Sequence, residues 1–233
     1  GSNDFSDASN YWIENSNNQL IGNHGAGSEV HAFWFELRGL NGLSRNGQYR
    51  NQFALVEKTE GPGYGDSSAF EANVAHSAVD RGFGLNHASH VQNERYIGTD
   101  ANPQLVNEFW KVDDFTIYKV GLGIYVRGIG GDFNEVKMAD NNTSTRFRLN
   151  QSLNNSLIVG RSANVGNPTT QEEIDNDRSL PENGNFEGHQ LYDGPGGIKN
   201  VHFSGFNGEG DYAIKESNAV HKATTHYAEN ITF

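Results

Sequence analysis

The segment between residues 71 and 90 carries the side chains best suited to acid–base chemistry. Hydrolysis of a polysaccharide needs two carboxyl groups placed across the scissile bond, and elimination from a uronic acid needs a base together with a cation that neutralises the carboxylate. The candidate catalytic residues are Glu71, His76, Asp80 and Arg81. A solvated polar turn has the same composition, so a hydrolase or lyase site and a purely structural turn are both open interpretations.

Metal binding is a second chemistry that the residue types allow. His87 and His90 are three residues apart, a spacing that converges on a helix but not on a strand, so zinc is disfavoured. Clusters of carboxylates and amides favour calcium instead, and the candidate ligands are Asp175, Asp177 and Asp140. Turns rich in Asn and Asp have this appearance without any metal, and no other cofactor is indicated.

Four segments predict strands that position a binding surface. They share one alternating pattern and span residues 32–36, 82–86, 123–127 and 146–150. Because side chains alternate across a strand, the apolar residues are expected to point inward and their neighbours outward. The two outward columns predicted in this way are Trp34, Gly84, Tyr125 and Arg148, and Glu36, Asn86, Arg127 and Asn150.

These columns have the chemistry of a surface for an acidic polysaccharide. Aromatic faces stack on sugar rings, and guanidinium groups pair with carboxylates. The predicted substrate-binding residues are Trp34, Glu36, Asn86, Tyr125, Arg127, Arg148 and Asn150. Outward aromatic residues also pack beneath long loops, and the sequence predicts such loops near residues 39–68, 88–112 and 161–187. Loop packing and ligand contact are therefore both open.

Short apolar segments recur along the chain at a regular interval. The steps from Phe115 to Val136 and from Val136 to Leu157 are about 21 residues each, and the step from Leu157 to Val201 is about twice that. One such repeat cannot bury its apolar face alone, so neighbouring repeats are expected to stack around a shared core. No long segment has helical periodicity, and the sequence predicts an all-β solenoid.

Composition excludes several classes of protein. The 233 residues contain no Cys, which excludes a disulfide scaffold and a Cys-ligated zinc site. The net charge of −12 argues against a nucleic-acid partner, because a phosphate backbone requires a basic surface. No apolar run approaches the roughly 18 residues of a membrane span, and no signal peptide begins the chain. Gly1-Ser2 has the appearance of a tag remnant, and we expect one domain over residues 1–233, excised from a larger secreted bacterial protein.

Three motifs in a fixed order carry a resemblance to a known family. The first runs from Tyr11-Trp12 through Gly25-Ala-Gly-Ser28 to Phe33-Trp-Phe35, the second is Asn155–Gly166 with Arg178–Pro181, and the third is Gly188–Pro195. With these motifs the chain resembles the family of the cell migration-inducing hyaluronan-binding protein and the cell-surface hyaluronidase, and more loosely fibrocystin. Tyr192–Pro195 is interpreted as a turn that closes a strand.

The resemblance implies a right-handed parallel β-helix of the pectin-lyase type, from the carboxy-terminal part of an extracellular or cell-surface protein. It favours a module that binds, and helps to degrade, an acidic glycan such as hyaluronan, with the other domains of the parent protein as further partners. A solenoid that spaces domains or supports protein contacts is the alternative. A polysaccharide hydrolase or lyase is a third interpretation.

Overall fold

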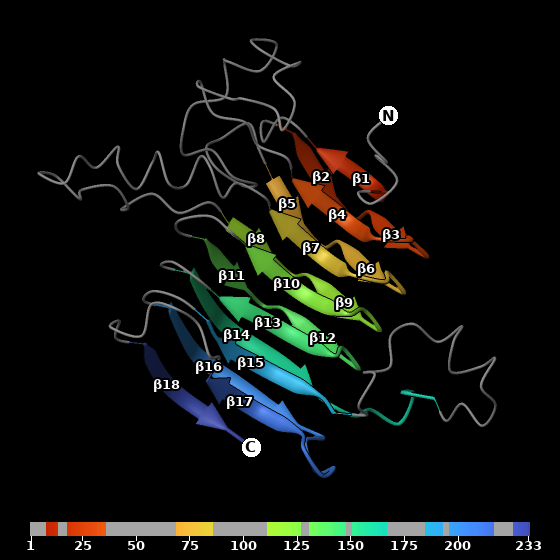
Figure 1. Cartoon of the computed structure of the whole chain (residues 1–233). Coiled ribbons are helices and arrows are strands. Elements are labelled where there is room, and N and C mark those ends of the chain that lie inside the picture. Colours follow the sequence, from red (N-terminus) through yellow and green to blue (C-terminus); the bar gives the residue numbers. More distant parts are fainter. Residues whose placement is uncertain are drawn as a thin grey trace, which may run out of the picture.

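The computed structural model describes residues 8–13, 18–35, 69–85, 111–126, 131–147, 151–166, 185–192, 196–216 and 226–233. Within these residues every regular element is a β-strand, and all strand pairs are parallel. The strands stack as successive rungs from β1 to β18 (Figure 1). The predicted all-β, parallel β-helix fold is confirmed. Among the described residues no helix is long and apolar enough to cross a membrane.

Each complete coil contains three short strands, where the sequence predicted two. In one coil these are β5 (Ala69–Glu71), β6 (Val74–His76) and β7 (Arg81–Leu85). Equivalent strands of successive coils pair with one another and form a seven-stranded and an eleven-stranded sheet. The third strand of each coil belongs to the seven-stranded sheet.

The seven-stranded sheet has the order β1-β4-β7-β10-β13-β15-β17. Besides β7 its members are β1 (Ser9–Ile13), β4 (His31–Phe35), β10 (Leu122–Val126), β13 (Thr143–Phe147), β15 (Glu187–Leu191) and β17 (Tyr212–Glu216).

The eleven-stranded sheet contains the first two strands of each coil. The first strands are β2 (Gln19–Ile21), β5, β8 (Lys111–Asp113) and β11 (Asp132–Asn134). The second strands are β3 (His24–Ala26), β6, β9 (Thr116–Tyr118) and β12 (Lys137–Ala139). In later coils the two merge into the long strands β14 (Gln151–Val159) and β16 (Gly196–Ser204), and β18 (Tyr227–Thr232) pairs with β16.

The bend between the first and second strands is made by a residue in the left-handed conformation. Asn155, Asn200 and Asn230 occupy it with φ of 51°, 54° and 53°, and Asn tolerates this conformation better than most residues. Their side chains form a ladder, since Asn200 donates to Asn155 at 2.8 Å and Asn230 donates to Asn200 at 2.9 Å. Ala72 lies at the same bend with φ of 53° and is exposed.

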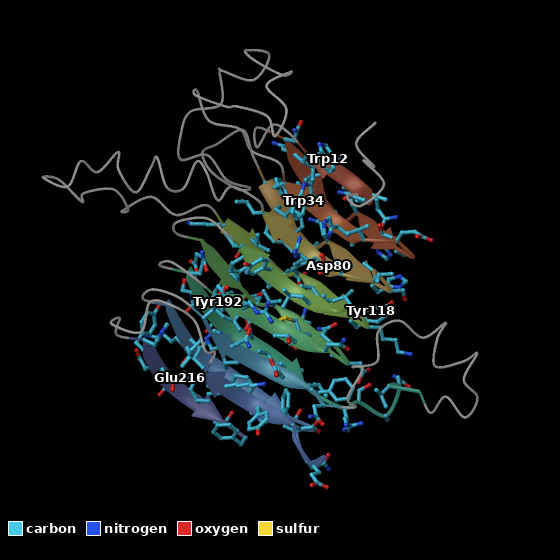
Figure 2. All side chains as sticks on the ribbon, viewed as in Figure 1. Trp12, Trp34, Asp80, Tyr118, Tyr192 and Glu216 are labelled. Carbon is cyan, nitrogen blue, oxygen red and sulfur yellow. The ribbon has the colours of Figure 1, made fainter. Side chains whose placement is uncertain are left out.

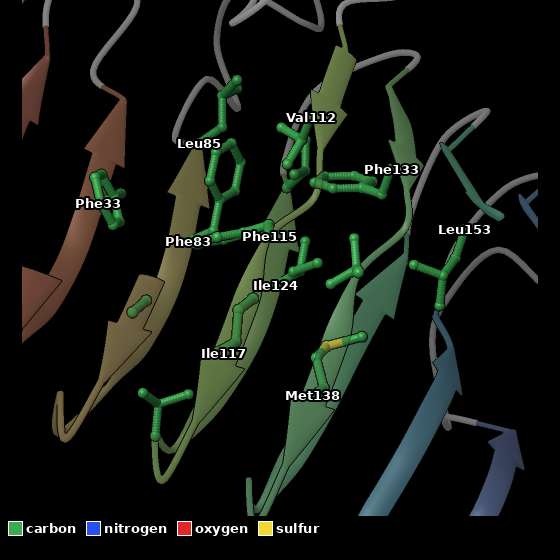
Figure 3. Packing of buried hydrophobic residues seen from close by; sticks show 14 of the residues in the cluster. Phe33, Phe83, Leu85, Val112, Phe115, Ile117, Ile124, Phe133, Met138 and Leu153 are labelled. Carbon is green, nitrogen blue, oxygen red and sulfur yellow. The ribbon is translucent and has the colours of Figure 1, made fainter. Parts of the chain in front are cut away.

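The interior of the coil is filled by Phe side chains together with aliphatic residues and Met138 (Figure 3). Phe33 meets Phe115 edge to face at 5.8 Å, and Phe83 meets Phe133 in the same way at 5.7 Å. Edge-to-face pairs add about 0.5–1.5 kcal/mol to the burial of each ring. Both pairs join residues two coils apart, so aromatic contacts tie the repeats into one core.

The repeat is one residue shorter after Val136 than the sequence analysis expected. Val136 lies beside Ser156, whose Oγ accepts a hydrogen bond from the Val136 amide at 3.0 Å. Leu157 pairs with Lys137 and is 39% exposed, so its placement in the inward column was wrong. A slip of one residue moves a side chain to the opposite face of a strand, and Ile158 takes the buried place instead.

Candidate functional site

One row of residues runs across all seven strands of the seven-stranded sheet. Their registered Cα positions place Trp12, Trp34, Gly84, Tyr125, Arg146, Gln190 and Lys215 side by side. We call this row the outer column. Phe33 and Phe35 on either side of Trp34 belong to the hydrophobic core, whereas Trp34 lies outside that core. The labelled Trp12 and Trp34 follow one another along the solenoid in Figure 2. The sequence analysis correctly placed Trp34, Gly84 and Tyr125 in one outward row.

The row contains Arg146 at the position where Arg148 was predicted. Tyr125 pairs with Arg146, so the expected alignment of residues 146–150 was wrong by two residues. A constant step of 21 residues from Tyr125 leads to Arg146, and this was the signal in the sequence that pointed to the correct residue. The remaining predicted binding residues lie outside the described residues: Glu36, Asn86, Arg127, Arg148 and Asn150.

The two central aromatic side chains of the outer column are buried, although they were predicted to be exposed. Trp34 is 5% exposed and Tyr125 is 6% exposed. The ring of His31 stacks on Trp34 at a centroid distance of 4.2 Å. The guanidinium carbon of Arg81 lies 5.3 Å from the Trp34 ring and 5.2 Å from the Tyr125 ring, so the arginine is held between them.

Gly84 provides the room for this arrangement. A Cβ atom at this position would lie 2.6 Å from Cε3 of Trp34 and 3.1 Å from Cδ of Arg81. Real Cβ atoms do not approach side-chain carbons so closely, because protein interiors are already close-packed. The missing side chain thus lets Arg81 reach into the outer column from the start of β7.

Arg146 occupies the next place along the outer column. Its guanidinium carbon lies 5.8 Å from the Tyr125 ring and 5.7 Å from the Tyr192 ring. Its Nε donates a hydrogen bond to Oε1 of Gln190. Among the residues that the structure describes, no carboxylate forms an ion pair with Arg146. Gln190 was not predicted as a binding residue, and Tyr192 was predicted only as part of a turn that closes a strand.

The other two cations of this surface are paired with carboxylates of the same chain. Arg81 lies 3.3 Å from Oδ2 of Asp80, and Lys215 forms an ion pair with Glu187. Glu187 is held further by Oγ1 of Thr143, which donates to it at 3.3 Å. Arg146 is therefore the member of the three that forms no ion pair with a carboxylate among the described residues.

Burial sets the protonation of the groups around Arg81. It raises the pKa of Asp80 above the ordinary value, against the opposing effect of Arg81 and Arg146. Burial, assisted by Arg81, lowers the pKa of His31 to about 3. The imidazole is consequently neutral near pH 7, and its contact with Asp80 at 3.8 Å is not an ion pair under those conditions.

The four catalytic candidates do not form one cluster. Glu71 ends β5 and His76 ends β6, both in the eleven-stranded sheet, and His76 stacks on Tyr118 at 4.7 Å. Asp80 and Arg81 lie at the start of β7 in the other sheet. The structure thus separates the predicted set into two pairs, and only the second pair adjoins the outer column.

The calcium candidates include one described residue. Asp140 is 3% exposed, and its carboxylate accepts hydrogen bonds from N and Oγ of Ser162 at 2.7 and 2.6 Å. These contacts, together with its φ of 56°, give it the role of a turn residue. Asp175, Asp177, His87 and His90 lie outside the described residues. Within the described part of the chain no three metal-binding side chains come together.

Comparison with known proteins supports the resemblance drawn from the three motifs. Residues 1–83 match the family model described as CEMIP beta-helix. The chain is 29% identical over 241 residues to the cell migration-inducing and hyaluronan-binding proteins of Mus musculus and Homo sapiens. The matches cover 87% of this chain but only 17% of each relative's length. The chain therefore resembles one β-helical region of a much longer type of protein.

Proposed function

We propose that this chain, which resembles the β-helix of the hyaluronan-binding relatives, is an extracellular module that binds an acidic polysaccharide along the outer column. The observation that carries the proposal is Arg146, a cation held between two tyrosine rings without a carboxylate partner among the described residues. A guanidinium fork pairs with a carboxylate through two parallel hydrogen bonds. A uronate carboxylate is a ligand group of matching charge and geometry.

The aromatic residues of the outer column divide into two groups by exposure. Trp34 and Tyr125 are buried and hold the guanidinium groups, so they are not free to stack on a sugar. Trp12 is 41% exposed at the first strand of the row, and Tyr192 is partly exposed. We assign sugar stacking to Trp12 and Tyr192, because a sugar needs an accessible ring face.

The spacing of the cations fits a polymer that runs across the strands. Arg81, Arg146 and Lys215 lie on β7, β13 and β17, and one strand of the sheet separates each from the next. Two steps of the sheet span about 10 Å, a distance comparable with two linked sugar rings. A polysaccharide with one carboxylate in every second sugar would meet the three cations in turn. Hyaluronan, named in both relatives, is the first glycan to test.

Replacement of Arg146 tests the proposal. Hydrogen bonds to a charged group contribute about 1.5–3 kcal/mol, so Arg146→Ala is expected to weaken hyaluronan binding about tenfold or more. Arg146→Lys keeps the charge but loses the fork and should recover only part of the affinity. Isothermal titration calorimetry with hyaluronan oligosaccharides measures both effects.

Lys199→Ala is the matched control, because Lys199 lies on β16 in the other sheet and is paired with Glu229 at 2.9 Å. It removes one positive charge without touching the outer column and should leave the affinity unchanged. Equal losses of hyaluronan affinity in the Arg146 and Lys199 variants would show that the effect comes from net charge and not from the outer column. Failure of the unaltered chain to bind hyaluronan, chondroitin, alginate and neutral glucans would favour the structural spacer.

A further inference from the structure

The carboxylate of Asp80 forms an ion pair with Arg81, a cation that the proposed binding surface needs. Its Oδ2 lies 3.3 Å from a terminal guanidinium nitrogen of Arg81, and the two side chains are 41% and 20% exposed. Arg81 is oriented by the rings of Trp34 and Tyr125, so its guanidinium keeps its place in the outer column. Asp80 therefore stands where the carboxylate of a polysaccharide would pair.

The two carboxylates beside the outer column are held differently. Glu187 pairs with Lys215 and also accepts hydrogen bonds from Thr143 and Gln190. The carboxylate of Asp80 forms charged contacts only with Arg81 and His31 among the described residues. Since its side chain is half exposed and has no hydrogen bond beyond these contacts, Asp80 is the carboxylate that an incoming ligand can replace at lowest cost.

We propose that Asp80 is an intramolecular competitor of the polysaccharide for Arg81, and that its protonation strengthens glycan binding as the pH falls below neutral. This inference rests on the proposed function of the outer column. Protonation neutralises the Asp80 carboxylate, so a ligand carboxylate no longer competes with its negative charge for the Arg81 guanidinium.

The charged and titratable groups around Asp80 are consistent with stronger glycan binding at lower pH. His31 faces it from β4, Arg81 from β7, and Arg146 acts on it from β13. Burial raises the pKa of Asp80, which moves its protonation toward neutral pH, although the two arginines oppose the shift. The pKa of His31 is about 3. The imidazole therefore stays neutral in mildly acidic solution and cannot itself supply the added positive charge.

The pH dependence of binding in the unaltered chain is the first measurement. Exposed ion pairs contribute about 0.2–1 kcal/mol, so affinity for hyaluronan oligosaccharides is expected to rise by up to about fivefold as the pH is lowered from neutral through the titration of Asp80. Dextran sulfate is the second probe, because its sulfate groups do not titrate in this range and it should show the same increase. Loss of affinity for both polymers on acidification would overturn the inference.

Asp80→Asn supplies the second measurement. This nearly isosteric change is expected to give, at about pH 7.5, an affinity two- to fivefold higher than that of the unaltered chain and to abolish the increase on acidification. Glu71→Gln is the matched control, because Glu71 is an exposed carboxylate in the other sheet and its neutralisation changes net charge equally. An equal gain in the Glu71 variant, or an unchanged pH dependence in the Asp80 variant, would overturn the inference.

The outcomes separate the inference from the proposed function. Binding that is lost on Arg146→Ala but does not respond to Asp80→Asn leaves the proposed function in place and refutes the competitor role. Absence of binding by both the unaltered chain and the Asp80 variant refutes both.

Discussion

Gly84 is the residue on which the packing of the outer column depends. Its hydrogen atom faces Trp34 and Arg81, and an added methyl group would lie 2.6 Å from the indole. We therefore expect Gly84→Ala to lower the free energy of unfolding by about 1–3 kcal/mol and to weaken glycan binding by displacing Arg81. Urea unfolding measures the first effect, and calorimetric titration the second.

Gly196→Ala is the matched control for Gly84→Ala. A Cβ atom at Gly196 would meet its nearest neighbours at 3.5 Å or beyond, which is ordinary van der Waals contact. This change should cost far less stability and leave binding intact. Equal tolerance of alanine at both positions would show that Trp34 and Arg81 are not packed as described.

Single residues of the site could be predicted only where alternation along one strand decides their place. The pattern Gly123-Ile-Tyr-Val126 was enough to send Tyr125 outward. The burial of Tyr125 depends on Arg81, which precedes it by more than 40 residues and reaches it from β7. No local pattern reports a contact of that kind, and this is why the predicted exposure was wrong.

The bends between strands differ in conformational strain, because some place Gly in the left-handed conformation and others place a residue with a Cβ atom there. Ala72 has φ of 53°, whereas the preceding coil has Gly22 with φ of 68° at the equivalent bend. The left-handed conformation costs a residue with a Cβ atom roughly 1–2 kcal/mol. Replacement by Gly removes this cost, but the greater conformational entropy of Gly in the unfolded chain offsets part of the gain in stability. Ala72→Gly is therefore expected to raise the free energy of unfolding by about 0.5–1 kcal/mol.

Thermal and urea unfolding check the Ala72 prediction, with Ala75→Gly as the opposite case. Ala75 is completely buried between the sheets, so removal of its methyl group should lower stability. A lower melting temperature for Ala72→Gly would contradict the assignment of strain to this bend.

At the scale of the elements, the sequence predicted strands well and their number in each coil poorly. Asn and Asp occupy several of the bends, because these residues tolerate the left-handed conformation. The second strand of each coil has only three residues in β3, β6, β9 and β12, too short for alternation to be recognised. The slip at Arg148 arose because the alternating pattern of residues 146–150 was aligned without the step of 21 residues that leads from Tyr125 to Arg146.

The solenoid as a whole could be predicted because buried apolar residues recur at the interval of one coil. Phe115 and Val136 lie in adjacent coils, as their spacing of 21 residues indicated. Stacked coils present equivalent residues at regular steps, and the places of Arg146 and Lys215 in the outer column follow from that geometry. The pairing of Arg81 and Lys215 with acidic residues could not be predicted in the same way, because side-chain conformation across strands decides it.

The net charge of −12 opposes the approach of an acidic polymer to the whole molecule. The repulsion acts at long range and is screened within about 8 Å at physiological salt, whereas the contacts of Arg146 are short. We therefore expect hyaluronan affinity to rise from about 10 mM to about 100 mM salt, as the Debye length falls from about 30 Å to 10 Å, and to decline above that range. Titrations across a salt series at constant pH measure this curve. A steady loss of affinity from the lowest salt onward would instead show that the cations of the outer column dominate the field even at long range.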